Sequence, residues 1–275
     1  MSADVASVRP LLAGAILAWA ALCGSIAIAA PAATAGCSAK SGAQTTALLE
    51  LYTSEGCDSC PPADRWLSSS FPPSVANPGV IPLAFHVDYW DRLGWKDRFA
   101  ARAWTDRQYA AAHAAGSTLV YTPQVLLQGK DFSGWRSAQT SKASVAAASA
   151  RPARADIALE TVPREGAIAV KATVRVPDAT NRKGAALFVA LVDSGLVSEV
   201  KAGENAGKQL RHDHVVRALR GGIPVDGGGS VAQDIVLPLP LEAGSAATIV
   251  AFVQNVDTGD VLQALASPIA CAPAR

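Results

Sequence analysis

Residues 51–62 read LYTSEGCDSCPP and place two cysteines, Cys57 and Cys60, three positions apart. The apolar run before them predicts a buried strand, and the two prolines after them fit the first turn of a helix, where an amide hydrogen has no partner. The start of a helix carries unpaired N–H groups and the positive end of its dipole, and both favour a thiolate over a thiol. We therefore expect Cys57 to act as a nucleophile and Cys60, one helical turn on, to close a disulfide with it.

A Thr-Pro pair is the second signal. Residues 121–125 read YTPQV, and a proline is tolerated at the first position of a strand. With the CxxC motif, this pair makes residues 45–150 resemble the thioredoxin superfamily, in which a cis-proline faces the CxxC motif and aligns an extended substrate. The resemblance implies catalytic roles for Thr122 and Pro123 beside the two cysteines.

The first half of the chain alternates strand-like and helix-like segments, which favours an α/β domain with parallel pairing. Asp97 is expected to cap a helix that runs to residue 115, where Gly116 stops it. Residues 128–131 read QGKD and predict a hairpin turn. The other expected elements are a helix ending near residue 70, a strand at 80–87 and a last helix at 135–150.

The second half changes its hydrophobic period. Apolar residues alternate with others along 168–176 and 235–241, which predicts strands with one buried face. Pro238 and Pro240 cannot donate to a ladder, so the second of these strands is expected at a sheet edge. Short strands over about 120 residues suggest a β-sandwich. The predicted fold is therefore an α/β thioredoxin-like domain at 36–152, followed by an all-β sandwich-like domain at 153–275.

Further stretches make the resemblance more specific. They are CPPAD at 60–64, FHVDYW at 85–90, GWKD at 94–97, GENAG at 203–207 and HDHVVR at 212–217. Together with residues 51–57, they are similar to the secreted bacterial family called domain of unknown function 1223, over nearly the whole mature chain. The family implies a thioredoxin-like fold and export, and it assigns no activity.

The N-terminal region carries a targeting pattern. Residues 11–30 are almost entirely apolar, and small residues surround Ala29 and Ala35. This is typical of a secretory signal peptide, here residues 1–35, and predicts a periplasmic or secreted protein with no membrane contact after cleavage. Two alternatives stay open: an uncleaved anchor helix, since about 20 apolar residues span a bilayer, and a lipoprotein acylated at Cys37.

The chain has five cysteines, and one of them, Cys23, falls within the predicted signal peptide. An even number remains, which favours disulfides in an exported chain. Cys37 and Cys271 are the two outside the CxxC motif, and chain termini often lie close together. The sequence therefore predicts a structural disulfide between them, with two free thiols or a lipidated Cys37 as the alternatives.

Two pairs of polar residues invite a functional interpretation. His86 and Asp88 are two apart on a predicted strand and share a face. Either is a candidate proton carrier for the dithiol and His86 a candidate metal ligand; alternatively, both are a hydrogen-bonded pair beneath the loop at 90–97, which is itself either a lid or core packing. His212 and His214 share a face if their segment is a strand; because no acidic or sulfur partners lie nearby in sequence, a metal site is the weaker interpretation and we expect a solvated strand face there.

Three functions fit these observations. The first is a thiol–disulfide oxidoreductase that needs no cofactor and acts on a protein or small-molecule thiol or disulfide. The second is a periplasmic protein that holds a soft metal such as Cu(I) with Cys57, Cys60 and His86. The third is a redox-inert binding module. A net charge of +1 gives no indication of nucleic acid as a partner, and the oligomeric state stays open.

Overall fold

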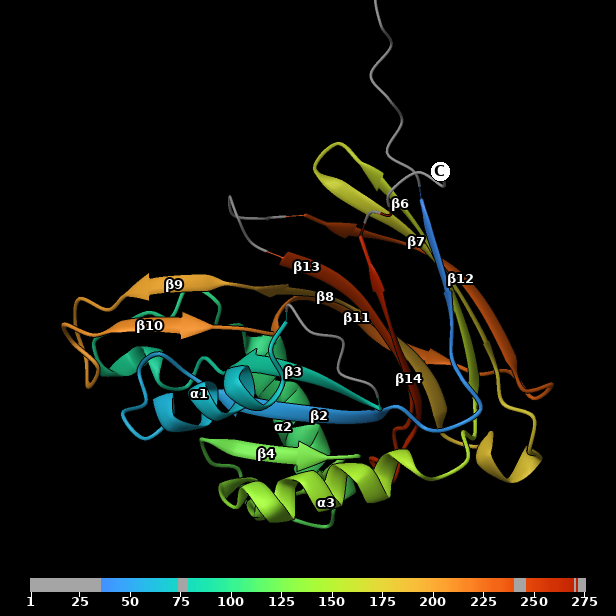
Figure 1. Ribbon diagram of the computed structural model, residues 1–275, viewed down its shortest axis with the longest axis horizontal. Coiled ribbons are helices and arrows are strands. Elements are labelled where there is room, and N and C mark those ends of the chain that lie inside the picture. The colour runs from blue at the N-terminus through green and yellow to red at the C-terminus, as the bar shows by residue number, and fades with distance from the viewer. Residues whose placement is uncertain (1–35, 74–78, 240–245, 270, 272–275) are drawn as a thin grey trace, which may run out of the picture. The chain divides into compact units, whose positions relative to one another are not determined.

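The computed structural model describes residues 36–73, 79–239, 246–269 and 271 (Figure 1), so the predicted signal peptide lies outside the described residues. These described residues belong to one compact unit. Among the described residues, none of the helices has the length and apolar character needed to cross a bilayer.

The central strands are β2 (Ala47–Thr53) and β3 (Val80–His86), which are buried at every position. They pair in parallel, and burial on both faces is what a parallel pair requires. On the other side of β2, β4 (Gln124–Leu127) and then β5 (Lys130–Asp131) continue the sheet in antiparallel fashion. The predicted hairpin turn joins these last two strands.

Helices cover both faces of this part of the sheet. Successive side chains of β2 point to opposite faces, and each set packs against different helices. Leu49 and Leu51 share a core with residues of α1 and α3, whereas Leu48 and Tyr52 share another with Trp104 of α2. In Figure 1, α1 and α3 lie in front of α2. The bounds of the helices, including three short 3-10 helices, are α1 Pro61–Ser70, η1 Asp91–Leu93, α2 Arg102–Ala114, η2 Ser133–Arg136, α3 Ala138–Ser149 and η3 Ala179–Asn181.

The expectation that Asp97 caps a helix is wrong. α2 begins at Arg102 with Ala101 as its N-cap. The carboxylate of Asp97 instead accepts a hydrogen bond from the backbone N–H of Glu55 at 2.9 Å, 42 residues earlier in the chain. A local capping signal was thus overridden by a long-range partner. The other end of α2 is as predicted, since Gly116 follows it with a φ of 70°.

The second half is built of strands. One sheet has the order β1-β6-β7-β12, and its apolar positions alternate with exposed ones along β6 and β7. β12 lies at the edge of this sheet, which confirms the expectation from Pro238. The bounds of these strands are β1 Cys37–Lys40, β6 Asp156–Arg164, β7 Ala167–Arg175 and β12 Ser230–Pro238.

The remaining strands join the first half rather than forming a separate sheet. The described strands of the larger sheet run in the order β14-β13-β8-β11-β3-β2-β4-β5, and β9 pairs with β10 in a hairpin. Within this larger sheet, the strand pairing that joins the halves is that of Val215 of β11 with Ala84 of β3. The bounds are β8 Ala185–Ser194, β9 Leu196–Glu199, β10 Gln209–His212, β11 Val215–Pro224, β13 Ala246–Asn255 and β14 Val261–Pro268.

β8 shows how the two halves share their cores. Leu187, Val189 and Leu191 pack with the four-stranded sheet, whereas Ala190 and Val192 pack with β2, β3 and α2. The boundary expected near residue 152 therefore does not separate two sheets. β1, which precedes it, also pairs with β6, which follows it.

Candidate functional site

The CxxC motif lies between β2 and α1. β2 ends at Thr53, and α1 begins at Pro61 with Cys60 as its N-cap. Cys57 and Cys60 form a disulfide with their Cα atoms 5.4 Å apart. The backbone N–H of Cys60 also donates to the carbonyl of Cys57 at 3.2 Å, so the loop is a tight turn against the start of the helix. This is the strand–turn–helix context that the sequence predicts.

Both cysteines of this disulfide are fully buried, with 0% of each residue exposed. The two residues between them, Asp58 and Ser59, are exposed. Ser59 places its Oγ 3.4 Å from the Sγ of Cys57. The loop therefore presents polar surface to the solvent and holds its sulfur atoms beneath that surface.

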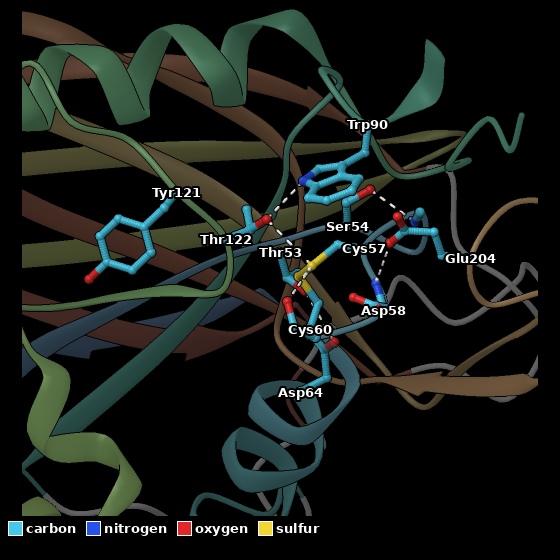
Figure 2. The surroundings of a disulfide bond; sticks show 12 residues. Thr53, Ser54, Cys57, Asp58, Cys60, Asp64, Trp90, Tyr121, Thr122 and Glu204 are labelled. Atoms are coloured by element: carbon cyan, nitrogen blue, oxygen red, sulfur yellow. Dashed lines mark hydrogen bonds between the residues drawn. A yellow bond between two sulfur atoms is a disulfide. The ribbon is translucent and has the colours of Figure 1, made fainter. Parts of the chain in front are cut away.

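A chain of hydrogen bonds ends on Cys57 (Figure 2). Trp90 Nε1 donates to Thr122 Oγ1 at 2.8 Å, and Thr122 Oγ1 donates to Cys57 Sγ at 3.4 Å. Because the indole N–H occupies the acceptor side of the hydroxyl, the hydroxyl hydrogen is directed at the sulfur. The Thr122–Pro123 peptide bond is cis. The structure thus brings Thr122 to Cys57, and it adds Trp90 as the group that orients Thr122.

Asp64 is a buried carboxylate on the same side of α1 as Cys60. It follows Cys60 by four residues, and Figure 2 shows the two side chains next to each other. Its Oδ2 accepts a hydrogen bond from Thr53 Oγ1 at 3.1 Å. Burial raises the pKa of Asp64 above its ordinary value. A carboxylate of this kind is a stronger base than one in water.

His86 and Asp97 form a buried ion pair behind the CxxC loop. Nδ1 of His86 lies 2.6 Å from Oδ2 of Asp97, and both side chains are buried. Burial works to lower the pKa of His86, but the charge of Asp97 and its hydrogen bond raise the pKa above its ordinary value. Burial likewise works to raise the pKa of Asp97, and the charge of His86 holds it below its ordinary value.

His212 lies beside this pair, so the expectation of a solvated strand face is wrong. It is 3% exposed, its ring centroid lies 4.9 Å from that of His86, and its Nε2 lies 3.4 Å from Oε1 of Glu55. Burial works to raise the pKa of Glu55, but the nearby His212 ring lowers it. His214 is also buried, with Nε2 2.6 Å from the carbonyl oxygen of Phe71. Partners from the first half of the chain bury both rings.

Two ring nitrogens of this cluster, Nε2 of His86 and Nδ1 of His212, lack a hydrogen-bond partner within the part of the chain that the structure describes. Nε2 of His212 and Oε1 of Glu55 have only their 3.4 Å contact with each other. Buried polar atoms are nearly always paired in native proteins, and the exceptions concentrate at functional sites. The cluster therefore makes the region behind the CxxC loop part of the candidate site.

Asp88 has a different position from the one that its spacing predicts. β3 ends at His86, so the two-residue period of a strand does not extend to Asp88. Its carboxylate accepts a hydrogen bond from Thr105 Oγ1 of α2 at 2.5 Å. His86 and Asp88 thus bind different partners.

The metal-binding alternative gains no third ligand. Among the described residues, no three His, Cys, Asp or Glu side chains are arranged to hold a metal ion. His86 is turned toward Asp97, and Cys57 and Cys60 are joined to each other.

The other two described cysteines, Cys37 and Cys271, also form a disulfide. Their Cα atoms are 5.3 Å apart, and 234 residues of sequence separate them. Cys37 belongs to β1 of the four-stranded sheet and is buried. The bond fixes the start of the described chain to a residue that follows β14.

The loop between β9 and β10, residues 200–208, reaches the CxxC motif from the second half. Glu204 Oε2 accepts a hydrogen bond from the backbone N–H of Asp58 at 3.1 Å (Figure 2). Asn205 Nδ2 donates to the carbonyl oxygens of Glu55 and Cys57 at 2.8 and 2.9 Å. The site is therefore assembled from both halves of the chain.

A family model described as "Protein of unknown function (DUF1223)" matches residues 48–254. The chain belongs to this family. The match includes the CxxC motif, the Thr-Pro pair and the β9–β10 loop, which are the parts that meet at the site. No curated protein matches the chain.

Two solved structures resemble this DUF1223 protein in fold. Protein AGR_C_4864 from Agrobacterium tumefaciens has 23% identity and a TM-score of 0.56; the match covers 86% of this chain and 99% of that one. HBP35 of Porphyromonas gingivalis has 15% identity and a TM-score of 0.63, with 83% of this chain and 76% of that one covered. At these identities, the likeness is one of fold alone.

Sequence reasoning did not single out several residues of the site as functional. Asp64 was detectable, since a residue four positions after Cys60 lies on the same face of a helix. Asn205 and Glu204 were not, because no spacing rule connects a loop to a motif about 150 residues away. The same is true of His212, whose partners belong to other elements.

Proposed function

We propose that this DUF1223 protein is an exported thiol–disulfide oxidoreductase. Its first half serves as a thioredoxin-like redox module, and its Cys57–Cys60 disulfide exchanges with a thiol or disulfide of a protein or small molecule. The observation that carries the proposal is the hydrogen bond from Thr122, next to the cis-proline, to the Sγ of Cys57. A hydrogen bond to the charged form of a group favours that form. Thr122 would therefore stabilise a Cys57 thiolate.

The first step of the exchange begins from the dithiol. The Cys57 thiolate attacks one sulfur of a substrate disulfide, so that an S–S bond forms between Cys57 and the substrate. The old S–S bond breaks, and one substrate thiolate leaves with its electron pair and takes up a proton. Thr122, held by Trp90, and the N-terminus of α1 stabilise the charge on Cys57 before the attack.

The second step releases the other half of the substrate. Asp64 accepts the proton of the Cys60 thiol, for which its raised pKa suits it. The Cys60 thiolate then attacks Cys57, the Cys57–Cys60 bond forms, and the second substrate thiolate leaves and is protonated. The protein loses two electrons, and the substrate disulfide gains them. The same steps in reverse oxidise a substrate dithiol.

A purely structural disulfide is the second candidate, and the complete burial of both cysteines favours it. A nucleophile must reach its substrate, whereas a structural bond has no such need. The two candidates differ in whether Cys57 reacts with an external disulfide when the protein is folded.

The test is an exchange assay with the reduced, folded protein and a small disulfide. We expect Cys57→Ser to abolish exchange and Cys60→Ser to accumulate the mixed disulfide at Cys57, detected by mass spectrometry. Ser70→Ala, which changes an exposed serine at the far end of α1, is the matched control and should retain exchange. Full activity in Cys57→Ser would show that Cys57 is not the nucleophile, and no exchange by the native protein would favour the structural interpretation.

A further inference from the structure

Asn205 is a buried amide in an otherwise exposed turn. It has 0% exposure, whereas Glu204 before it and Ala206 after it are exposed. Burying an amide costs free energy unless its hydrogen bonds are made. A side chain that turns inward from a surface loop in this way requires specific partners, and here those partners lie in the CxxC loop.

Each hydrogen-bonding group of the Asn205 side-chain amide has a partner. Nδ2 donates to the carbonyl oxygen of Glu55 at 2.8 Å and to that of Cys57 at 2.9 Å. Oδ1 accepts a hydrogen bond from Lys208 Nζ at 2.8 Å, which fixes the orientation of the amide. The two carbonyls lie on either side of Gly56, so Asn205 restrains the segment that leads into Cys57.

The Cys57 carbonyl therefore receives two donors, from Asn205 and from the backbone N–H of Cys60. In the oxidised protein, the S–S bond also restrains this loop. Reduction breaks that bond and adds two electrons and two protons to give two thiols. After reduction, the two hydrogen bonds to the Cys57 carbonyl and the one to the Glu55 carbonyl remain, together with those that the backbone N–H groups of Glu55 and Asp58 donate to Asp97 and Glu204.

We propose that Asn205 is a positioning residue for the Cys57–Cys60 couple, through which the second half of the chain sets the redox equilibrium of the first. This inference rests on the proposed function. By holding the reduced loop in the geometry of the oxidised one, Asn205 raises the effective concentration of Cys60 at Cys57. Loss of Asn205 frees the loop in the dithiol more than in the disulfide, because the disulfide stays restrained by its covalent bond. The dithiol is then favoured.

The experiment measures the equilibrium between the disulfide and the dithiol in buffers of reduced and oxidised dithiothreitol, by alkylation and mass spectrometry of the 57–60 peptide. We expect Asn205→Ala to shift this equilibrium about tenfold toward the dithiol, which is about 30 mV for a two-electron couple. Asn205→Asp keeps the shape but points an oxygen at the two carbonyls, so it should shift the equilibrium at least as far. In Asn205→Ala, the mixed disulfide at Cys57 should also resolve more slowly.

Two further variants keep the test decisive if Asn205→Ala does not fold. Lys208→Met leaves Asn205 in place but removes the ammonium that orients it, and we expect a smaller shift in the same direction. Gln209→Ala breaks the exposed bond from Gln209 to Glu199 on the same hairpin and should cause no shift. An unchanged equilibrium in every folded Asn205 and Lys208 variant, or an equal shift in Gln209→Ala, overturns the inference.

The equilibrium can be measured whether or not the protein catalyses exchange. A native protein that equilibrates with dithiothreitol but exchanges with no other disulfide contradicts the proposed function and leaves this test intact. A native protein that exchanges normally, with an equilibrium that Asn205 does not affect, contradicts the inference alone.

Discussion

The two disulfides of the described residues link very different amounts of chain. Cys37 and Cys271 are separated by 234 residues, whereas Cys57 and Cys60 are separated by three. In the chain-entropy account, a disulfide stabilises a protein by restricting its unfolded state, and the effect grows with the length of the closed loop. The long-range bond is therefore suited to stability, and the short-range bond contributes much less of it.

The two disulfides also differ in the polarity of the buried residues around them. At the buried positions of β6, β7 and β12, the one polar side chain is Thr161. Around the CxxC motif, by contrast, the buried residues include charged and hydroxyl-bearing side chains, some of whose polar atoms lack partners. One region follows the packing rules throughout. The region around the CxxC disulfide departs from them, as functional sites in proteins often do.

Removal of the long-range bond should give the largest effect on stability and none on exchange. We expect the Cys37→Ser, Cys271→Ser double variant to lose at most about 5 kcal/mol of unfolding free energy, since the loop it opens is so long. The measurement is guanidinium unfolding of oxidised protein, together with the exchange assay on the folded variant. A variant that keeps its stability but loses exchange would reverse the comparison of the two bonds.

Asp97→Asn should give an intermediate effect on stability. The substitution leaves the imidazolium of His86 buried without its counter-ion, which we expect to cost about 3 kcal/mol. Asp106→Asn is the matched control, because the partner of Asp106, Arg102, is exposed like itself. Removing that surface pair should cost less than about 1 kcal/mol. Equal losses in the two variants would show that the buried pair is not special.

The loss of unfolding free energy in Asp97→Asn should depend on pH in a defined direction. His86 has a raised pKa, so its contribution to folding stability is complete below its ordinary pKa of 6.5. That contribution is lost as pH rises through the pKa of the folded protein. Asp97 has a lowered pKa, so its contribution is complete above its ordinary value of 3.8 and is lost as pH falls through the folded value. The difference between native protein and Asp97→Asn should therefore be widest between these two pH values and narrower at pH 9. A difference that grows with rising pH contradicts the ion pair.

The features that the sequence predicts are those with local causes. The CxxC turn, the glycine after α2 and the edge position of β12 each follow from residues that act within a few positions of themselves. A proline lacks an amide hydrogen wherever the chain places it, so Pro238 was informative without any knowledge of the sheet.

The features that sequence reasoning missed depend on partners from distant parts of the chain. Aspartate is a residue type that often caps helices, but the carboxylate of Asp97 binds the backbone N–H of Glu55 and the ring of His86 instead. His212 was predicted to be solvated because its partners lie on other elements, and Asn205 belongs to a stretch that indicated only the family. Only the fold brings these residues to the CxxC loop.

Glu204→Gln should give the smallest effect, and it separates charge from structure at the mouth of the site. Glu204 is exposed and accepts a hydrogen bond from the N–H of Asp58, which a glutamine oxygen can also accept. Unfolding free energy should therefore stay within about 0.5 kcal/mol of the native value. The lost negative charge, however, no longer opposes a thiolate at Cys57. We expect iodoacetamide to alkylate reduced Cys57 about two- to threefold faster at low ionic strength, and equally fast at 1 M salt, where such charges are screened. Glu199→Gln, which removes an exposed charge elsewhere on the same hairpin, should change neither rate. A rate increase that persists at high salt would mean that Glu204 acts through the loop geometry, in the manner proposed for Asn205, rather than through its charge.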